Sequence, residues 1–495
     1  MVRTRTDMSL FFIFFKGSRK NSPKIKEVNS LQKKRIYLNA FDMNCVAHQS
    51  PGLWVHPEDQ SHRYNDIEYW VELAQLLERG RFDGVFIADV IGIYDVYGGD
   101  KSVTVREATQ VPVNDPILLV SAMARATKHL GFGITASTTF EHPYTFARRM
   151  STADHLSNGR VGWNIVTSYL ESGTKNIEIG DRFLHSERYN IADEYLEVCY
   201  KLWEGSWEDD AVVKDKDKKV FTDPTKVHEI QHHGKYFDVP GIHLCEPSPQ
   251  RTPVLYQAGA SSTGRKFAAK HAECTFVSAP SKEAVSNYVQ DLRKQTAEVG
   301  RDPESIKVFT LVTPIVGRTE AEAWEKYEEL ASYISYEGAL SLVSGWSGVD
   351  FSKYDPDQEI EYIETNAIKS LLESLTTLSS QKKWTVRELA NFAGIGGMGP
   401  ILVGNPKQIA DSLEEWIDDT DIDGFNLAYA ITPGTFEDFV ELVVPELQRR
   451  GVLKTEYEEG TLREKLYGKG QARLPESHTA HHYRKIKASV TPKNS

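Results

Sequence analysis

Short apolar runs alternate with longer segments of helical periodicity along most of the chain. The first run spans 36–42, and the segment 64–81 after it carries Trp70, Leu73 and Leu77 at the spacing of one helical face. Further apolar runs occur at 84–89, 130–138, 160–168, 253–260, 274–279, 306–316 and 425–430. Their helical partners are predicted at 115–128, 145–157, 186–203, 263–271, 282–299, 321–334 and 436–450. The alternation therefore predicts eight strand–helix units.

Eight such units favour an α/β fold in which helices cover a parallel sheet. Because there are eight such units, we expect a (β/α)8 TIM barrel rather than an open, doubly wound sheet. One barrel domain is predicted over 36–476. Two stretches interrupt this alternation of strands and helices, at 204–252 and 335–400. Both are predicted to be insertions near the face where barrel loops form active sites.

The two ends of the chain differ in composition from this central domain. Residues 1–35 contain ten Lys and Arg against Asp7 and Glu27, whereas the chain of 495 residues has a net charge of −12. We expect this basic extension to be disordered, with an organelle presequence as the alternative. The polar, His- and Lys-rich residues 477–495 are also predicted to form a disordered tail.

Charge and cysteine content narrow the partners and the compartment. An acidic chain is a poor ligand for nucleic acid or for an anionic membrane surface. The strongly apolar run near the start, 10–15, falls far short of the roughly 20 residues of a membrane span. Four cysteines without a CxxC pair favour a reducing compartment, so the predicted location is the cytoplasm.

One short motif suggests zinc chemistry. His228, Glu229 and His232 have the HExxH spacing, which on a helix would indicate a zinc metallopeptidase with the glutamate as base. Pro224 and Gly234 lie too close on either side for a helix of more than two turns. An insertion hairpin is therefore the favoured interpretation, and no metal is predicted.

Two glycine-containing segments are candidates for phosphate binding. Residues 394–399 have GxGxxG spacing, but a helical pattern precedes them and Pro400 follows, so we expect a loop rather than a dinucleotide site. Residues 259–265 come after a predicted strand and open a helix. There, small residues, Ser261 and free N–H groups could bind a phosphate, whereas a plain helix cap is the alternative.

Several polar residues lie where predicted strands end. The carboxyl ends of barrel strands meet on one rim, and active sites of TIM barrels are built there. We therefore expect these residues to converge: Cys45, His48, Asp89, Thr138, Ser168 and Ser261.

Longer motifs resemble a known family. They are NAFDMNCVAH (39–48), GLWVHPEDQSHRYND (52–66), FIADVIGIYDVY (86–97), EHPYTFARRMSTADHL (141–156) and LCEPSPQRTPVLYQAGAS (244–261). Together they resemble the nitrilotriacetate, pristinamycin and dibenzothiophene-sulfone monooxygenase branch of the bacterial-luciferase-like flavoproteins. Within that branch the similarity is greatest to long-chain alkane monooxygenases, and it runs from about residue 37 to about residue 486.

The resemblance implies a luciferase-like barrel that binds reduced FMN (FMNH2), delivered by a separate NAD(P)H-dependent flavin reductase. O2 would add to the flavin at C4a, and the resulting hydroperoxide would oxygenate the substrate. A homodimer is also implied. The implied FMN contacts are Asp89, Thr138, Ser168, Tyr189, Ala260 and Ser261. The implied pocket residues near the flavin ring are Cys45, His48, Tyr94 and Gln110.

The chain departs from the alkane enzymes at Tyr169, where they have a histidine. We expect His48, Tyr94 and Tyr169 to donate hydrogen bonds to the peroxide. A long-chain alkane is the leading substrate, with sulfones, amines and amino-polycarboxylates as alternatives that keep the same flavin chemistry. A non-catalytic flavin carrier and a deazaflavin-dependent dehydrogenase stay open as alternatives to a monooxygenase.

Overall fold

The computed structural model describes residues 33–177, 187–259, 261–279, 281–360 and 384–484. The chain divides into two units, Met1–Lys33 and Lys34–Ser495, and the second contains every element discussed below. The predicted N-terminal extension falls almost entirely outside the described residues.

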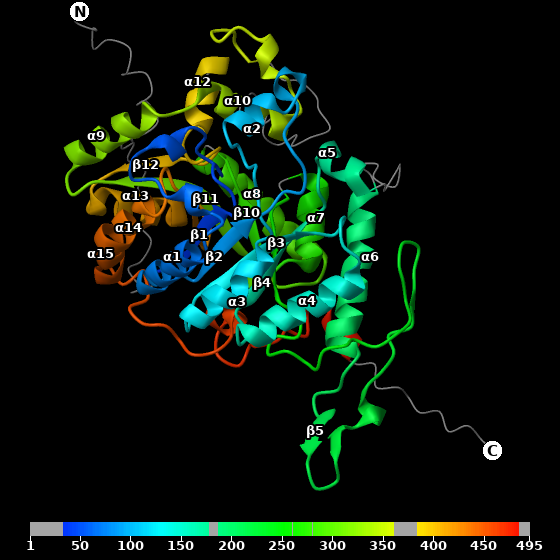
Figure 1. Cartoon of the computed structure of the whole chain (residues 1–495). Coiled ribbons are helices and arrows are strands. Elements are labelled where there is room, and N and C mark those ends of the chain that lie inside the picture. Colours follow the sequence, from blue (N-terminus) through cyan, green and yellow to red (C-terminus); the bar gives the residue numbers. More distant parts are fainter. Residues whose placement is uncertain (1–32, 178–186, 260, 280, 361–383, 485–495) are drawn as a thin grey trace, which may run out of the picture. The chain divides into compact units, whose positions relative to one another are not determined.

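Eight parallel strands close into a barrel, as the sequence predicts (Figure 1). They are β1 (Tyr37–Met43), β2 (Gly84–Ala88), β3 (Gly131–Ser137), β4 (Val161–Val166), β9 (Val254–Gln257), β10 (Cys274–Val277), β11 (Lys307–Val316) and β13 (Gly424–Leu427). The ring closes where β1 pairs with β13 and β10 pairs with β11. Near-continuous apolar strands suit this position, because one face meets the barrel interior and the other meets helices.

Helices cover the outside of the barrel. The principal ones are α1 (Ile67–Arg79), α3 (Ile117–Ala126), α4 (Pro143–Leu156), α6 (Arg188–Tyr200), α7 (Ser262–His271), α8 (Lys282–Glu298), α13 (Pro406–Thr420) and α15 (Val444–Arg449). The predicted apolar face of α1 is buried, with Trp70, Leu73 and Leu77 in the main core.

Further elements connect these parts. They are α2 (Ser102–Arg106), α5 (Glu171–Thr174), α9 (Glu320–Ala331), α14 (Gly434–Asp438), α17 (His481–Arg484), the 3-10 turns at Leu53–Val55, Ser61–Arg63, Tyr97–Gly99, Lys175–Ile177, Pro224–Lys226, Pro303–Ser305 and Phe351–Lys353, and the π turns at Lys201–Gly205 and Phe439–Val443.

A ninth strand corrects the predicted pairing. β12 (Ile401–Gly404) lies beside the outer half of β11, with Thr313 opposite Ile401. Helix α9 packs on β12, and α13 fills the place between α8 and α15 in the outer ring. The helical periodicity predicted residues 321–334 in that place. β12 was not predicted, because four strand residues directly after a glycine-rich loop look like part of the loop.

Helix α16 (Leu462–Tyr467) closes the amino end of the barrel. Leu462 and Leu466 join an aromatic cluster in the interior that includes Phe86 and Phe309. Arg463, 1% exposed, bonds both carboxylate oxygens of Glu273, with distances of 2.7 Å from Nε and 3.0 Å from Nη2. The helix therefore combines an apolar plug with a buried ion pair.

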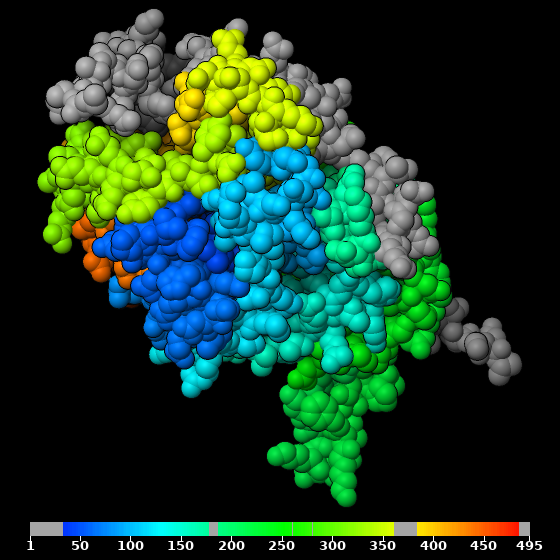
Figure 2. Space-filling model, turned by 45° about the horizontal axis from the view of Figure 1, so that its top comes forward, coloured from blue at the N-terminus to red at the C-terminus, as the bar shows by residue number. Residues whose placement is uncertain are grey.

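The first insertion contains two hairpins rather than a zinc helix. β5 (Val212–Asp215) pairs with β6 (Val220–Thr222), in an arm that projects from the rest of the surface (Figure 2). β7 (His232–His233) pairs with β8 (Asp238–Val239), and Gln231, at φ 46°, interrupts any helix through the HExxH segment. Among the described residues, no three His, Cys, Asp or Glu side chains form a metal site. The zinc alternative is wrong, and the hairpin interpretation holds.

The second insertion forms a cap built on α10 (Tyr336–Ser347) and α12 (Val386–Ala393). Every residue of α10 from Gly338 to Ser347 is buried, and its apolar side chains form a separate core with Tyr94 and Leu170. A helix that is buried all round must lie between other layers.

The glycine-rich loop after α12 is structural. Gly396 and Gly397 have φ values of 70° and 73°, and their N–H groups bond Ser50 Oγ and the Gln49 carbonyl. A helix precedes this loop and no helix opens on it, which fits the predicted loop and not a dinucleotide site.

The predicted C-terminal tail starts too early. His478 is buried and its Nε2 lies 2.9 Å from the carbonyl of His271, and α17 follows it. Residues 477–484 therefore pack on the barrel, and only 485–495 lie outside the described residues. None of the helices described is both long and apolar enough to cross a membrane.

Candidate active site

Four side chains from distant parts of the chain form one hydrogen-bonded chain over the carboxyl end of the barrel. The Tyr94 hydroxyl donates to Gln110 Oε1 at 3.0 Å, and it also lies 2.9 Å from the Tyr169 hydroxyl. Trp346 Nε1 in α10 donates to the Tyr94 oxygen at 3.2 Å. Gln110 Nε2 donates to the carbonyl of His48 at 2.7 Å. The structure thus brings together four of the five predicted pocket residues through direct hydrogen bonds.

His48 and Cys45 belong to the loop that follows β1. The His48 ring stands edge-on to Phe41 of the barrel interior, with 4.5 Å between centroids. Burial lowers the pKa of His48 to about 3, so the imidazole is neutral near pH 7. Burial also raises the pKa of the Cys45 thiol, and Asp42 and Asp89 add to this effect. Cys45 is therefore a neutral thiol rather than a nucleophilic thiolate.

The backbone at two of the predicted positions is strained. Gln110 and Ser168 have φ values of 53° and 54°, in the left-handed region that side chains other than glycine seldom adopt. Such strain persists where surrounding contacts enforce it, and it concentrates at functional sites. Here the Gln110 N–H donates to Ala47 and Arg188 donates to the Ser168 carbonyl at 2.8 Å.

The rim formed by β2, β3 and β4 carries three more of the predicted residues. Ser168 Oγ lies 2.7 Å from Ser137 Oγ, and the Thr138 N–H donates to the carbonyl of Val166 at 3.0 Å. Asp89 follows β2 directly. Burial raises the pKa of its carboxyl to about 7, with repulsion from Asp115 as a smaller cause. Near neutral pH Asp89 is therefore poised between its acid and its carboxylate.

The predicted phosphate end lies at the start of α7. Ser261 caps this helix, and its Oγ accepts from the Gly264 N–H at 3.0 Å. Burial raises the pKa of Tyr189, and a hydrogen bond between its hydroxyl and Ser261 opposes this. A Cβ at Gly259 or Gly264 would come within 3.0 or 2.9 Å of the Tyr189 hydroxyl, so the cradle admits only glycine at both positions. Ala260 lies outside the described residues.

Trp346 was not predicted as a site residue. It lies 252 residues from Tyr94 in an insertion with no motif of its own, so only the folded chain reveals the contact. Gly345 beside it is equally necessary, because a Cβ there would lie 2.0 Å from the Tyr94 ring. The ring and the hydroxyl of Tyr94 both fix α10 over the barrel mouth.

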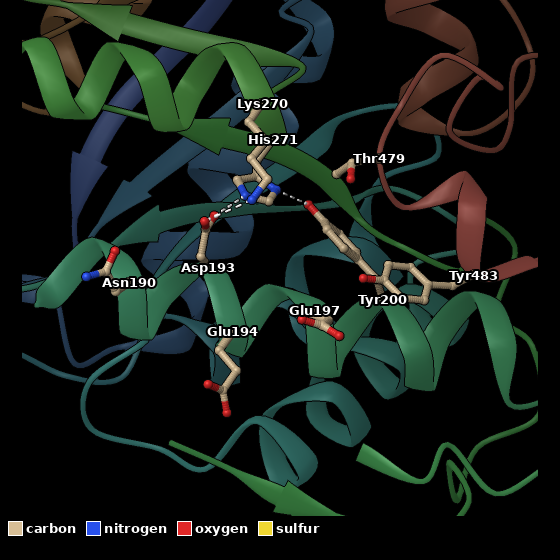
Figure 3. A pocket seen from close by; sticks show the side chains of 9 residues that line it. All are labelled: Asn190, Asp193, Glu194, Glu197, Tyr200, Lys270, His271, Thr479 and Tyr483. Atoms are coloured by element: carbon tan, nitrogen blue, oxygen red, sulfur yellow. Dashed lines mark hydrogen bonds and ion pairs between the residues drawn. The ribbon is translucent and has the colours of Figure 1, made fainter. Parts of the chain in front are cut away.

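A polar cavity of about 240 Å³ lies elsewhere, between α6, the end of α7 and residues 479–483 (Figure 3). In it His271 bonds Asp193 through Nε2 at 2.5 Å and Tyr200 through Nδ1 at 3.1 Å. Lys270 also bonds Asp193, at 2.8 Å. These side chains are paired with one another, and none of the predicted site residues lines the cavity, so it is not the candidate active site.

The barrel and its rim of polar side chains define a class, the TIM-barrel enzymes that act at the carboxyl ends of the strands. The chain belongs to the luciferase-like monooxygenase family, whose sequence model matches residues 43–422. It is therefore a flavin-dependent monooxygenase, and the predicted family and fold are confirmed.

Two relatives are equally similar. The chain is 54% identical over 452 residues to the dimethyl-sulfide monooxygenase of Hyphomicrobium sulfonivorans, covering 91% of this chain and 94% of that protein. It is also 54% identical over 457 residues to the long-chain alkane monooxygenase of Geobacillus thermodenitrificans, covering 92% and 100%.

Two further comparisons bear on the cofactor and on its supply. The crystal structure of riboflavin lyase RcaE with modified FMN and riboflavin superposes with a TM-score of 0.85 at 36% identity, covering 91% of this chain and 100% of that one. Nitrilotriacetate monooxygenase component A of Aminobacter aminovorans is 36% identical over 422 residues, covering 84% and 93%.

Proposed function

We propose that this chain is the oxygenase of a two-component system, which uses reduced FMN and O2 to oxygenate a small, uncharged, apolar substrate. The observation that carries the proposal is the buried hydrogen-bonded chain Trp346–Tyr94–Gln110–His48 under the apolar helix α10. It lies at the end of the barrel where TIM-barrel enzymes react.

The start of α7 suits the phosphate of FMN. A helix N-terminus offers free N–H groups and a positive dipole end, and both favour an anion. Gly259 and Gly264 leave room for close approach, and the hydroxyls of Ser261 and Tyr189 lie beside them. Asp89, Thr138 and Ser168 are proposed to hold the flavin ring on the rim.

The chain itself would orient the reactants and exclude water. Bound reduced FMN would supply two electrons to O2, so that one oxygen atom enters the substrate and the other leaves as water. His48 is neutral over the physiological range, so it can hold a hydrogen bond without supplying a proton. Cys45, as a thiol, contributes apolar surface to the pocket wall.

The substrate is proposed from the lining and the relatives together. Dimethyl sulfide and long-chain alkanes, which the two relatives are named for, are both small in cross-section and apolar. Tyr94, Tyr169, Gln110 and Trp346 are all uncharged, which favours such a molecule over an amino-polycarboxylate. An alkane and a dialkyl sulfide are the two leading candidates, and sulfones and amines come after them.

A separate NAD(P)H-dependent flavin reductase is the proposed source of reduced FMN. The name "component A" of the nitrilotriacetate relative supports this, because it implies a second component. We propose a homodimer as the working form. The four cysteines are all free, which supports a reducing compartment and hence the cytoplasm.

A reductase-coupled assay tests the proposal. The protein, FMN, a flavin reductase and NADH are mixed with a panel of alkanes, dialkyl sulfides and sulfones, and products are identified by mass spectrometry. An oxygenated panel member, absent when the protein is omitted, is the expected result. FMN binding without product would favour a flavin carrier, and turnover without O2 using a deazaflavin would favour a dehydrogenase. Either result would contradict the proposal.

A further inference from the structure

The direction of every hydrogen bond around Tyr94 can be deduced. The carbonyl of His48 can only accept, so the Gln110 amide must face it with its nitrogen, 2.7 Å away. Reversing the amide would bring two oxygen acceptors together. The amide oxygen therefore faces Tyr94, whose single hydrogen is used in the 3.0 Å bond to it.

The remaining bonds then follow. The indole N–H of Trp346 can only donate, so it occupies one lone pair of the Tyr94 oxygen at 3.2 Å. Because Tyr94 has no second hydrogen, the 2.9 Å contact with Tyr169 requires the Tyr169 hydroxyl to donate to Tyr94. The hydrogens of Tyr169 and Tyr94 are thus both used within the network. In this network neither tyrosine has a hydrogen left to donate to a flavin-bound peroxide, in contrast to the sequence-based expectation.

The oxygen of Tyr169 can nevertheless still accept a hydrogen bond. Its side chain is only partly buried, whereas Tyr94 is 3% exposed. It directly follows Ser168 at the end of β4, on the rim proposed to hold the flavin. A hydroxyl whose hydrogen is used can still accept through its oxygen. The site therefore presents at Tyr169 an acceptor and not a donor.

We propose that Tyr169, oriented by Trp346 through Tyr94, makes the site select reduced over oxidised flavin. Reduction turns the flavin N5 atom from an acceptor into an N–H donor. An acceptor-only hydroxyl beside N5 would gain a hydrogen bond with the reduced ring and would meet a second acceptor in the oxidised ring. This inference rests on the proposed function. Trp346 acts through Tyr94 and is a positioning residue.

Anaerobic titration tests this selection without turnover. Dissociation constants of oxidised FMN and of photoreduced FMN are measured for the wild type, Tyr169→Phe and Trp346→Phe. The readout is the ratio of the dissociation constant of oxidised FMN to that of reduced FMN. We expect Tyr169→Phe to lower this ratio about tenfold, the effect of one net hydrogen bond. For a two-electron couple, that change equals a shift of about 30 mV in the potential of bound flavin. Trp346→Phe, which keeps an aromatic side chain but removes the N–H, should lower the ratio about threefold.

Tyr97→Phe is the matched control, because Tyr97 packs partly buried against the same cap core and has no place in the network. Its ratio should match that of the wild type. An unchanged ratio in folded Tyr169→Phe, or an equal fall in Tyr97→Phe, overturns the inference and leaves the proposed function intact. If Tyr169→Phe does not fold, an unchanged ratio in Trp346→Phe overturns it. A wild type that binds neither form of FMN overturns the proposed function as well.

Discussion

Arg463 at the amino end of the barrel and His48 at the carboxyl end differ in how fully their buried polar atoms are paired. At the amino end, Arg463 directs all three guanidinium nitrogens at acceptors, namely both oxygens of Glu273 and the carbonyls of Thr252 and Ala472. At the carboxyl end, the buried His48 Nδ1 has no hydrogen-bond partner among the described residues. Buried polar groups in native proteins are normally paired, and exceptions call for an explanation. The pairing at the amino end stabilises the fold, whereas His48 lies in the pocket where the substrate is proposed to bind.

The largest effect is expected from removing the ion pair at the amino end. Arg463→Met leaves the buried Glu273 carboxylate unpaired, so we expect a loss of about 3–5 kcal/mol in the free energy of unfolding. Urea unfolding measures it. The double variant Arg463→Met/Glu273→Leu should recover most of that loss. Equal stability of the single variant and the wild type would refute the assigned role of the plug.

At the carboxyl end, Ser261→Asp should act on FMN binding rather than on stability. Aspartate caps a helix as well as serine does, so α7 is kept. A carboxylate beside the proposed phosphate should weaken FMN binding on the order of 100-fold, through repulsion of like charges. Fluorescence titration gives the affinity, with Ser261→Asn as the uncharged control. Unchanged affinity in Ser261→Asp would rule out the phosphate site at α7.

His48→Phe should separate binding from chemistry. The ring keeps its contact with Phe41, so FMN affinity should stay within about twofold, while the yield of product per O2 falls about tenfold through loss of one hydrogen bond. The missing O2 should appear as H2O2, measured with a peroxidase assay. Wild-type coupling in this variant would remove His48 from the mechanism.

The smallest predicted effect concerns Asp89 and pH. Its folded pKa of about 7 lies above its unfolded value, so its contribution to stability is fully present below about pH 4 and is lost as pH rises through 7. Asp89→Asn cannot ionise. Relative to the wild type, it should therefore gain about 1 kcal/mol between pH 5 and pH 8, a modest value because Asp89 is partly exposed. The difference in the free energy of unfolding between Asp89→Asn and the wild type is measured by urea unfolding at both pH values. An equal difference at pH 5 and at pH 8 would contradict the raised pKa.

Local patterns in the sequence were enough to predict the barrel. Each strand is a continuous apolar run and α1 has one apolar face, so neighbouring residues reveal both elements. β12 was missed since its four residues follow directly on a glycine-rich loop. The early part of the predicted tail was wrong because His478 is buried by contacts with His271, far away in sequence.

The candidate site likewise contains residues that sequence patterns locate and residues that only the folded chain reveals. Asp89, Ser168 and Ser261 lie at strand ends or at a helix start, which a pattern can locate. Trp346 could not be found, because its role depends on an insertion folding back over Tyr94. The direction of the hydrogen bonds at Tyr169 also needed the structure, since it follows from a chain of partners drawn from four separate segments.

Labelled oxygen tests the central claim most directly. The wild type and Ser261→Asp are supplied with 18O2, a flavin reductase, NADH, FMN and either a dialkyl sulfide or an n-alkane. The account predicts one 18O atom in the product or its cleavage fragment for the wild type, and a much smaller yield for the variant at the same FMN concentration. Unlabelled product, or O2 consumption no faster than that of free reduced FMN with every substrate, would contradict it.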